Sequence, residues 1–472
     1  MSRSPHFRAR RAVAGLAAVL VSALTPIVAS GGPAGAAGFP AYSSHPLAGT
    51  FGTPPETTRD PDHPQRVLCY KSPCTAKNAT YAEEVRTLAQ DGNRLFLGGF
   101  FHGLVDGSRQ PVASTAFLAV LDATTGRLPA DQTFARNAAP DGTVESMVVS
   151  AGENRLYVGG RFSHIGGGAA DRVAALNLQT GKLDPTFHSP GFDGDVRSIA
   201  LAGGRLFVGG QFLKAGGRAF PGITALNAAD GSLVAGWTPP TNYGGSYIHI
   251  APTHTESVQG VVYAIAVVGN YLMVGGDFQH FGWTAAQDKN GLRYGGLIAL
   301  NTSDGKLASW HPWNQRPVIG MAVSPDGRKL YTAEGGSGGW VGAFTPGGTE
   351  NQIWFGRVDG DVMSVTATDT RVYAGGHFDA EVPNHNDPCL KSIPTHCTKT
   401  GSHHRHLVAF SASTGKADSG WTAQADTPEG PTYLLAGAKA LYVGGNFTNI
   451  LDRSKLDGGT GIPHPGFAMF PG

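Results

Sequence analysis

The residues whose types could do chemistry are carboxylates that stand immediately before short apolar segments. They are Glu83, Glu84, Asp141, Asp193, Asp195, Asp359, Asp361 and Glu429. If those segments are the innermost strands of a ring, the carboxylates converge at the mouth of its channel and could coordinate Ca²⁺. Asp193, Asp195, Asp359 and Asp361 are therefore a candidate cation site. Turn chemistry is the favoured alternative, because Asp-Gly is a common turn pair and no spacing matches a calcium-loop motif.

A second candidate is the histidine-rich segment 384–406, NHNDPCLKSIPTHCTKTGSHHRH. Its histidines are His385, His396, His403, His404 and His406. Such a cluster can bind zinc or copper. The string SHHRH, however, lacks the i, i+4 placement of strong motifs and includes the cation Arg405. A solvated loop pinned by a disulfide is the favoured interpretation.

Four cysteines form two pairs that are close in sequence, Cys69 with Cys74 and Cys389 with Cys397. Two local disulfides are the expected pairing of the three possible ones. They would pin surface loops rather than hold the fold, because short loops gain less from a crosslink. A zinc site is the alternative, but neither pair has the two-residue spacing of zinc knuckles.

Motifs of known enzymes are mostly missing. The sequence contains no H-E-x-x-H, no G-x-x-x-x-G-K-[ST] and no C-x-x-C. The string GGSGG at 335–339 satisfies G-x-S-x-G, but it lies in a glycine run after a predicted strand and not at a strand-to-helix turn. No residue is therefore assigned a catalytic role.

The elements that must position these residues follow a repeat. The string RLFVGGQF at 205–212 returns with small changes at 155–162, 271–278, 371–378 and 440–447. Around it lie an apolar segment, a turn, a third segment such as ITALNAADG at 223–231, and a piece with one aromatic. These runs are typical of strands. The first segments contain Val85, Val144, Val196, Val262, Val318, Val362 and Thr432. They predict an all-β, seven-bladed β-propeller of four-stranded antiparallel blades.

Two details of the repeat carry further predictions. The paired glycines should let neighbouring backbones approach closely, and the Phe two places later should pack between blades. The fifth unit, KLYTAEGGSGGW at 329–340, lacks that Phe and should be the least regular. The seventh unit ends after three strands, so we expect RVLCYK at 66–71 to complete it and close the ring. Residues 37–65 would be a flexible leader and 66–472 the propeller.

The pattern G-x-V-x-S, then D-G-x-L-x-V-G-G-x-F, then A-L-D-x-x-T-G resembles the delta-60 repeat β-propellers of secreted bacterial proteins. The resemblance covers roughly residues 80–470. It implies a propeller fold and export, and no catalytic residue is carried over.

The N-terminal segment and the composition agree with export. Residues 1–36 read as a signal peptide, with Arg8, Arg10 and Arg11 before an apolar stretch and a small-residue cleavage site. The mature chain should be secreted, extracellular and monomeric, without a membrane span. A formal net charge of +1 makes nucleic acid an unsuitable partner.

Long insertions are predicted to gather on one face of the disc. They are 238–260, 279–295, 379–406 and 448–465. Loops on a rigid scaffold commonly carry binding sites, so we expect a non-catalytic binding module for an extracellular protein or polysaccharide. The alternative is an extracellular lyase or hydrolase acting on a polysaccharide or small secreted molecule at the same face. Ca²⁺ is the one cofactor that the sequence suggests.

Overall fold

The structure is a computed structural model. It describes residues 42–50, 52–53, 83–241, 260–278, 295–310, 316–336, 338–348, 352–380, 404–426, 429–451 and 461–472, the single residues 312 and 314, and the backbone of 68–69, 79–80, 243–244 and 280–281.

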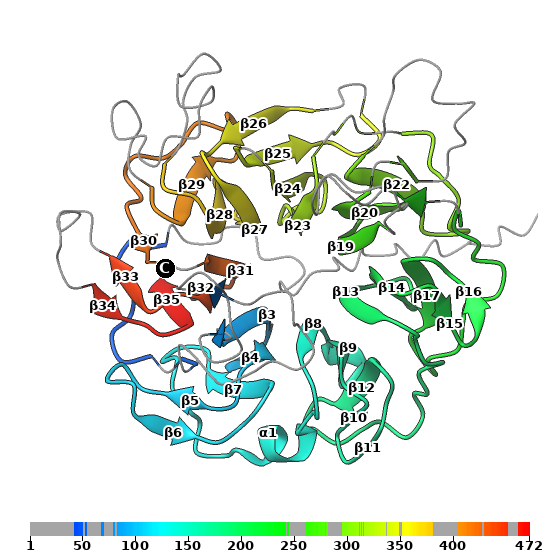
Figure 1. Cartoon of the computed structure of the whole chain (residues 1–472), viewed down its shortest axis with the longest axis horizontal. Coiled ribbons are helices and arrows are strands. Elements are labelled where there is room, and N and C mark those ends of the chain that lie inside the picture. The colour runs from blue at the N-terminus through cyan, green and yellow to red at the C-terminus, as the bar shows by residue number, and fades with distance from the viewer. Residues whose placement is uncertain are drawn as a thin grey trace, which may run out of the picture.

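The fold is all-β, because the described residues hold only one short α-helix, α1 (Thr133–Ala138), and one 3-10 turn, Ala151–Glu153. Seven antiparallel sheets of three or four strands stand side by side around a centre (Figure 1). From the inside outward they are β3 (Glu84–Asp91), β4 (Arg94–Phe100) and β7 (Leu118–Asp122); β8 (Val144–Ser150), β9 (Arg155–Gly160) and β12 (Val173–Asn177); β13 (Asp195–Ala202), β14 (Arg205–Gln211) and β17 (Ile223–Asn227); β19 (Val261–Val268), β20 (Tyr271–Asp277) and β22 (Leu297–Asn301); β23 (Val318–Val323), β24 (Leu330–Glu334), β25 (Trp340–Phe344) and β26 (Trp354–Arg357); β27 (Asp361–Ala367), β28 (Arg371–His377) and β29 (Leu407–Ser411); and β31 (Gly430–Ala436), β32 (Ala440–Asn446) and β35 (Phe467–Pro471).

Smaller sheets lie outside these seven. They are β1 (Leu68–Cys69) with β2 (Ala79–Thr80); β5 (Leu104–Val105) with β6 (Pro111–Ala113); β10 (His164–Ile165) with β11 (Gly168–Ala169); β15 (Lys214–Ala215) with β16 (Arg218–Ala219); β18 (Tyr243–Gly244) with β21 (His280–Phe281); and β30 (Gln424–Ala425), β33 (Asn449–Leu451) and β34 (Ile462–Pro463). None of the described helices is long and apolar enough to cross a membrane.

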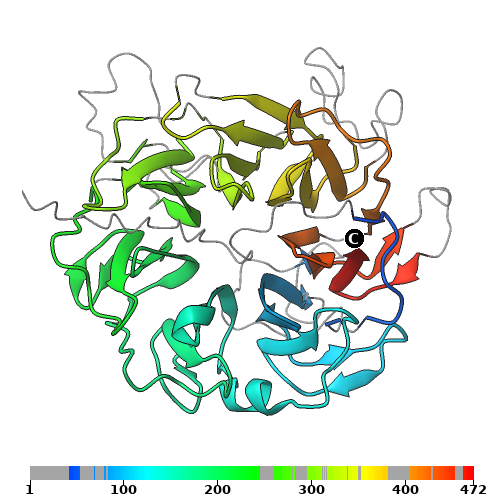
Figure 2. The same cartoon turned by 180° about the vertical axis from the view of Figure 1, so that it is seen from behind.

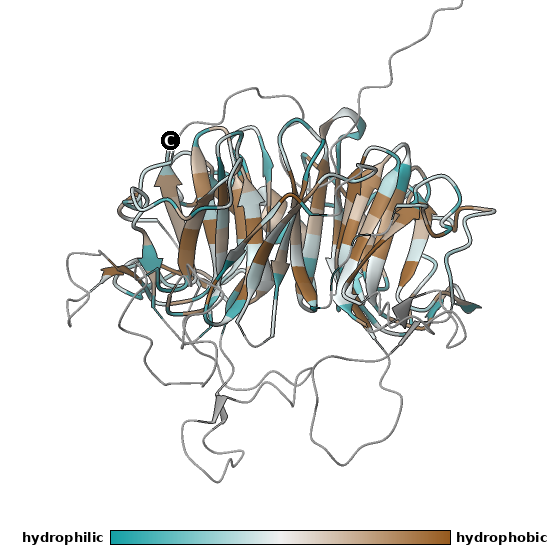
Figure 3. Cartoon of the chain, turned by 90° about the horizontal axis from the view of Figure 1, so that it is seen from above, coloured by the Kyte–Doolittle hydropathy of each residue, from teal (hydrophilic) through white to brown (hydrophobic). Residues whose placement is uncertain are grey.

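The innermost strands touch one another in sequence order around the centre, and the last of them, β31, packs against the first, β3. Viewed from behind and from the side, the sheets form a disc with the inner strands running through its thickness (Figures 2 and 3). Among the described strands, no hydrogen-bonded ladder joins one of these seven sheets to the next. Side-chain packing between sheets therefore holds this propeller-like arrangement together.

The first glycine of each pair lies against the next sheet, and the second lies against the innermost strand of its own sheet. A Cβ on Gly209 would lie 2.8 Å from Cγ1 of Val262 in the next sheet, and one on Gly210 would lie 2.0 Å from the carbonyl oxygen of Asp195. The second clash arises at a β-bulge, because the pairing of β13 with β14 shifts between Val196 and Ser198. All seven inner strands carry this shift opposite their second strand. The predicted role of the glycines is confirmed.

The outermost strands differ from the prediction of four-stranded blades. Among the described residues, six of the seven sheets have three strands, and in four of these the outer position is held by a single bridge, as between Leu226 and Leu233. The returning segment is short, and Gly236 at φ +77° turns it away before a ladder can extend. Its aromatic, Trp237, is nevertheless buried. The fifth unit, predicted to be the least regular, is the four-stranded sheet β23–β26.

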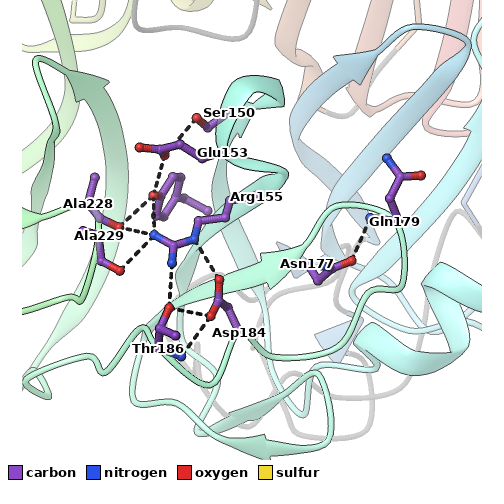
Figure 4. Close-up of polar contacts among 10 residues, drawn as sticks. Ser150, Glu153, Arg155, Asn177, Gln179, Asp184, Thr186, Ala228 and Ala229 are labelled. Atoms are coloured by element: carbon purple, nitrogen blue, oxygen red, sulfur yellow. Dashed lines mark hydrogen bonds and ion pairs between the residues drawn. The ribbon is translucent and has the colours of Figure 1, made fainter.

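Polar contacts lock adjacent sheets on the side of the short turns. Arg155 donates hydrogen bonds from Nη1 to the carbonyl oxygens of Ala228 and Ala229, at 2.7 and 2.9 Å, and pairs through Nε with Asp184 (Figure 4). Between the last and first sheets, Tyr442 donates from its hydroxyl to the carbonyl oxygen of Ala123 at 2.7 Å. These bonds satisfy carbonyls that the three-stranded sheets leave unpaired.

The last sheet is completed by residues 42–50. The backbone N–H of Ser43 donates to the carbonyl oxygen of Pro471, and that of Leu47 to Met469, both at 2.7 Å. Tyr42 is 2% exposed and donates its hydroxyl to the carbonyl oxygen of Gly437. Residues 42–50 thus belong to the fold, in contrast to the predicted flexible leader over 37–65.

The prediction that residues 66–71 complete the last sheet is wrong, because residues 43–47 hold that position. Leu68 and Cys69 form β1, which pairs with β2 and not with the last sheet. The outer edge of β35 is taken by residues 43–47 because Tyr42 supplies a buried ring that packs near Tyr373, with ring centroids 5.5 Å apart. Trp421 adds a hydrogen bond from Nε1 to the carbonyl oxygen of Ser43.

Replacing Gly209 with Ala should destabilise the fold by about 1 to 3 kcal/mol, because the new methyl group overpacks the contact with Val262. Chemical unfolding of the variant measures this loss. Gly152→Ala is the matched control, since a Cβ there meets nothing within 4 Å. The double variant G209A/V262A should lose less than the sum of the single changes, and strict additivity would contradict the assignment.

The closing segment should make stability pH-dependent. His464 is 1% exposed, its Nδ1 lies 2.9 Å from Oγ1 of Thr50, and burial lowers its pKa to about 4. Between about 6.5 and 4 the unfolded chain binds the extra proton, so His464 should remove roughly 3 kcal/mol of stability as the pH falls through this window. Tm measured against pH should be flatter for His464→Asn, and parallel curves for variant and wild type would contradict this.

Candidate functional site

The bulges aim one side chain from each innermost strand toward the centre of the ring. These seven residues are Arg86, Glu145, Arg197, Tyr263, Ile319, Met363 and Thr432, and all of them line one cavity of about 380 Å³. A bulge re-aims a side chain that regular alternation would place elsewhere. The same irregularity that fits the sheets together therefore builds the lining of the cavity.

The lining has a charged wall and a second, mixed part in which apolar side chains lie beside Asp361. Arg86, Glu145 and Arg197 come from β3, β8 and β13, which are neighbours in the ring. Ile319 and Met363, from β23 and β27, line the part formed by two other neighbouring strands. A ligand with a polar end and an apolar body would match both parts.

Glu145 is the centre of an ion-pair network at the charged wall. Its Oε1 lies 2.7 Å from Nη1 of Arg86, 2.9 Å from Nε of Arg161 and 3.8 Å from Nη1 of Arg197. Asp195 pairs with Arg161 at 3.2 Å and with Arg197 at 3.5 Å. Glu84 completes the set through Nε of Arg86 at 3.1 Å. Three guanidinium groups and three carboxylates thus hold each other in fixed orientations.

Burial and neighbouring charges shift the pKa values of two of these arginines in opposite directions. Burial lowers the pKa of Arg161 to about 10, with Glu145 opposing the change and Arg197 adding to it. Burial would also lower the pKa of Arg86, but the carboxylates of Glu145 and Glu84 outweigh it and raise that pKa. Both side chains are cations at neutral pH.

The structure separates the four aspartates of the predicted cation site. Asp195 belongs to the ion-pair network, and Asp361 lines the cavity and accepts a hydrogen bond from the backbone of Gly336 at 2.6 Å. Their two strands, β13 and β27, are not neighbours in the ring. Among the described residues, no group of three or more His, Cys, Asp or Glu could hold a metal ion.

Asp193 and Asp359 have the turn role that was the alternative. Oδ1 of Asp193 accepts the backbone N–H groups of Leu213 and Lys214, both at 2.8 Å. Oδ1 of Asp359 accepts those of Asp379 and Ala380 in the same way. Each carboxylate therefore fixes the loop that leaves the second strand of its sheet.

The histidine segment is only partly described. His404 and His406 are each 1% exposed, and Nδ1 of His406 lies 2.9 Å from the carbonyl oxygen of Gly376. Burial lowers the pKa of His406. These two residues are thus part of the interior, in contrast to the predicted solvated loop, because they follow the returning chain into β29.

Other predicted site residues lie outside the described part of the chain. They are His385, His396, His403, Cys74, Cys389 and Cys397, and of Cys69 only the backbone is described. Most of 245–259, 282–294, 381–403 and 452–460 lies outside it as well. The disulfides and the long loops stay predictions.

Sequence reasoning missed the arginines of the network. Arg86 and Arg197 occupy the variable position of G-x-V-x-S, which regular alternation would not direct to the centre. Arg161 occupies the variable position of Gly-Gly-x-Phe. Arg86, Glu145 and Arg197 hold the same position in three consecutive repeats. This alternation of charge is the signal that could have revealed the arginines.

Comparisons with protein-family models and with curated proteins find no match. Several solved structures have a similar shape. The computationally designed Ika8 protein is 11% identical, with a TM-score of 0.42, and the match covers 82% of this chain and 96% of that one. U3-55K is 11% identical, with a TM-score of 0.44 and coverage of 83% and 96%. The WD40 β-propeller domain of Doa1 is 11% identical, with a TM-score of 0.43 and coverage of 79% and 93%.

Glu145→Gln should destabilise the protein by about 3 to 5 kcal/mol, because it leaves buried guanidinium groups without their shared carboxylate. Urea unfolding measures the change. Asp379→Asn is the control, since Asp379 and its partner Arg405 are 65% and 46% exposed, and it should cost less than about 1 kcal/mol. Equal losses in both variants would show that the network adds nothing beyond a surface pair.

Proposed function

We propose that this chain is a secreted, monomeric, seven-bladed β-propeller that acts as a non-catalytic binding module. Its binding surface is the face that surrounds the mouth of the central cavity and carries the loops between second and third strands. The observation behind this proposal is the cavity itself, to which every innermost strand contributes one bulge residue.

Strand pairing brings the loops and the charged wall to the same face. Asp195, at the start of β13, pairs with Gln211, the last residue of β14, and Glu84 pairs with Phe100 in the first sheet. The loops that follow β4 and β14 therefore leave beside the ion-pair network. A partner bound by these loops would lie over the cavity mouth.

The network favours binding over catalysis. Each of its carboxylates is held by at least one guanidinium, so its charges are compensated and oriented before a ligand arrives. Preorganised polar groups lower the entropy cost of association. An extracellular protein or polysaccharide could place a polar group against Arg86 and Arg197 and an apolar part against Met363.

Filling the cavity tests the proposal. Met363→Trp should abolish binding of the full chain to its ligands on a panel of soluble cell-wall polysaccharides and secreted proteins, because the indole occupies the space of the ligand. Lys416→Trp is the matched control, since Lys416 lies in an exposed turn at the opposite face, and it should bind like wild type.

Two results would overturn the proposal. Binding that survives Met363→Trp undiminished would exclude the cavity mouth as the site. Cleavage products in the recovered polysaccharide, seen by mass spectrometry, would instead support the extracellular lyase or hydrolase.

A further inference from the structure

The fifth sheet is built differently from the others at the end that faces the long loops. Only five residues, 335–339, join β24 to β25, and the Phe of Gly-Gly-x-Phe is missing. In the other six sheets this Phe is at most 2% exposed and closes the end of the sheet. These residues are Phe101, Phe162, Phe212, Phe278, Phe378 and Phe447.

The fifth sheet instead carries an aromatic pair of which one ring, Phe355, is exposed. The rings of Trp340, on β25, and Phe355, on β26, stack with centroids 4.8 Å apart and planes 13° apart. Phe355 is 44% exposed and Ile353 beside it is 36% exposed. Among the described residues these are two of only four large apolar side chains with such exposure. Phe355 and Ile353 thus present apolar side chains to solvent at the outer strand of this sheet.

Two arginines flank the aromatic pair. Cζ of Arg316 lies 4.6 Å from the ring centroid of Trp340, and Cζ of Arg357 lies 5.1 Å from it. Arg316 donates from Nη1 to the carbonyl oxygen of Gly338 at 2.7 Å. Burial lowers the pKa of Arg316, and the carboxylates of Glu334 and Asp361 oppose this change.

Among the described residues, Arg357 has no such counter-charge. Its Nε and Nη1 are buried without a hydrogen-bond partner in the described part of the chain, and burial lowers its pKa. Burying a guanidinium without a carboxylate is costly, so an anion at its accessible edge would be stabilised. Arg357 ends β26, which leads into Asp361 at the lining of the central cavity.

We propose that the end of the fifth sheet is a binding subsite for a uronate residue of an acidic polysaccharide. Arg357 pairs with the carboxylate, and Phe355 with Trp340 supports the C–H face of the sugar ring. The subsite rests on the proposed binding role of this face and makes its partner an anionic glycan, but it does not need the central cavity to be occupied.

The chemistry of the surface favours a uronate over an acidic peptide. The remaining nitrogen of Arg357, Nη2, can donate a charge-assisted hydrogen bond to a carboxylate oxygen, and one uncompensated cation matches the single charge on each uronate. A rigid pyranose ring offers a face to the stacked aromatics. A flexible acidic side chain offers none, so it would leave Phe355 in water.

The experiment is isothermal titration calorimetry of the full chain with tetragalacturonate, its methyl-esterified form and a hexaglutamate peptide. Tetragalacturonate should bind, and the neutral ester should bind at least tenfold more weakly. Arg357→Gln should weaken tetragalacturonate binding at least tenfold. Phe355→Ala, at an exposed position, should weaken it several-fold without affecting folding. Arg405→Gln is the matched control, because it removes another exposed arginine and should change nothing.

Failure of the subsite and failure of the binding role give different results. Tetragalacturonate binding that is lost in Met363→Trp but unchanged in Arg357→Gln and Phe355→Ala would overturn the subsite and keep the binding role. Absence of tetragalacturonate binding, or hexaglutamate bound as tightly, would also overturn the subsite. Ligands on the panel that depend on Met363 would then still support the binding role.

Discussion

The structure depends on the close approach of neighbouring sheets at the paired glycines. Since no described ladder joins the seven sheets, the contact of Gly209 with Val262 and its equivalents hold them side by side together with single hydrogen bonds such as that of Tyr442 with Ala123. A side chain at these places would push adjacent sheets apart by more than core packing tolerates. This requirement accounts for the two adjacent glycines in the second strand of six of the seven sheets.

The same contact has a consequence for the centre of the molecule. In six sheets the second glycine of the pair lies against the bulge of the innermost strand, and in all seven the bulge turns one residue toward the axis. Because these positions are free of a packing role, their identities can vary from repeat to repeat. At these positions Arg86, Glu145 and Arg197 form a charged wall in the cavity that Ile319 and Met363 also line. A repeated scaffold can thus acquire a binding site without a change in its core.

The fifth sheet shows what happens when the repeat is altered. This sheet lacks the closing Phe and has a loop of only five residues. Trp340 and Phe355 lie at its end instead, and Arg316 and Arg357 lie close to the Trp340 ring. The sheet keeps its order because Trp354 is buried at its outer edge and β26 pairs fully with β25. Irregular sequence here marks a changed surface rather than a weakened sheet.

Local patterns in the sequence were enough to identify the inner strands, the all-β fold and the role of the glycines, because alternation and tight turns act over a few residues. They were not enough for contacts between distant segments. Residues 42–50 were predicted to be part of a leader, but they complete the last sheet because the buried ring of Tyr42 packs near Tyr373. No local sequence pattern indicates this contact. The aspartates before the inner strands were found, but only the tertiary structure decided that Asp193 and Asp359 bind loop backbone while Asp195 meets Arg161 and Arg197. Spacing along the chain determines which residues share a strand, whereas bulges and packing decide which of them meet.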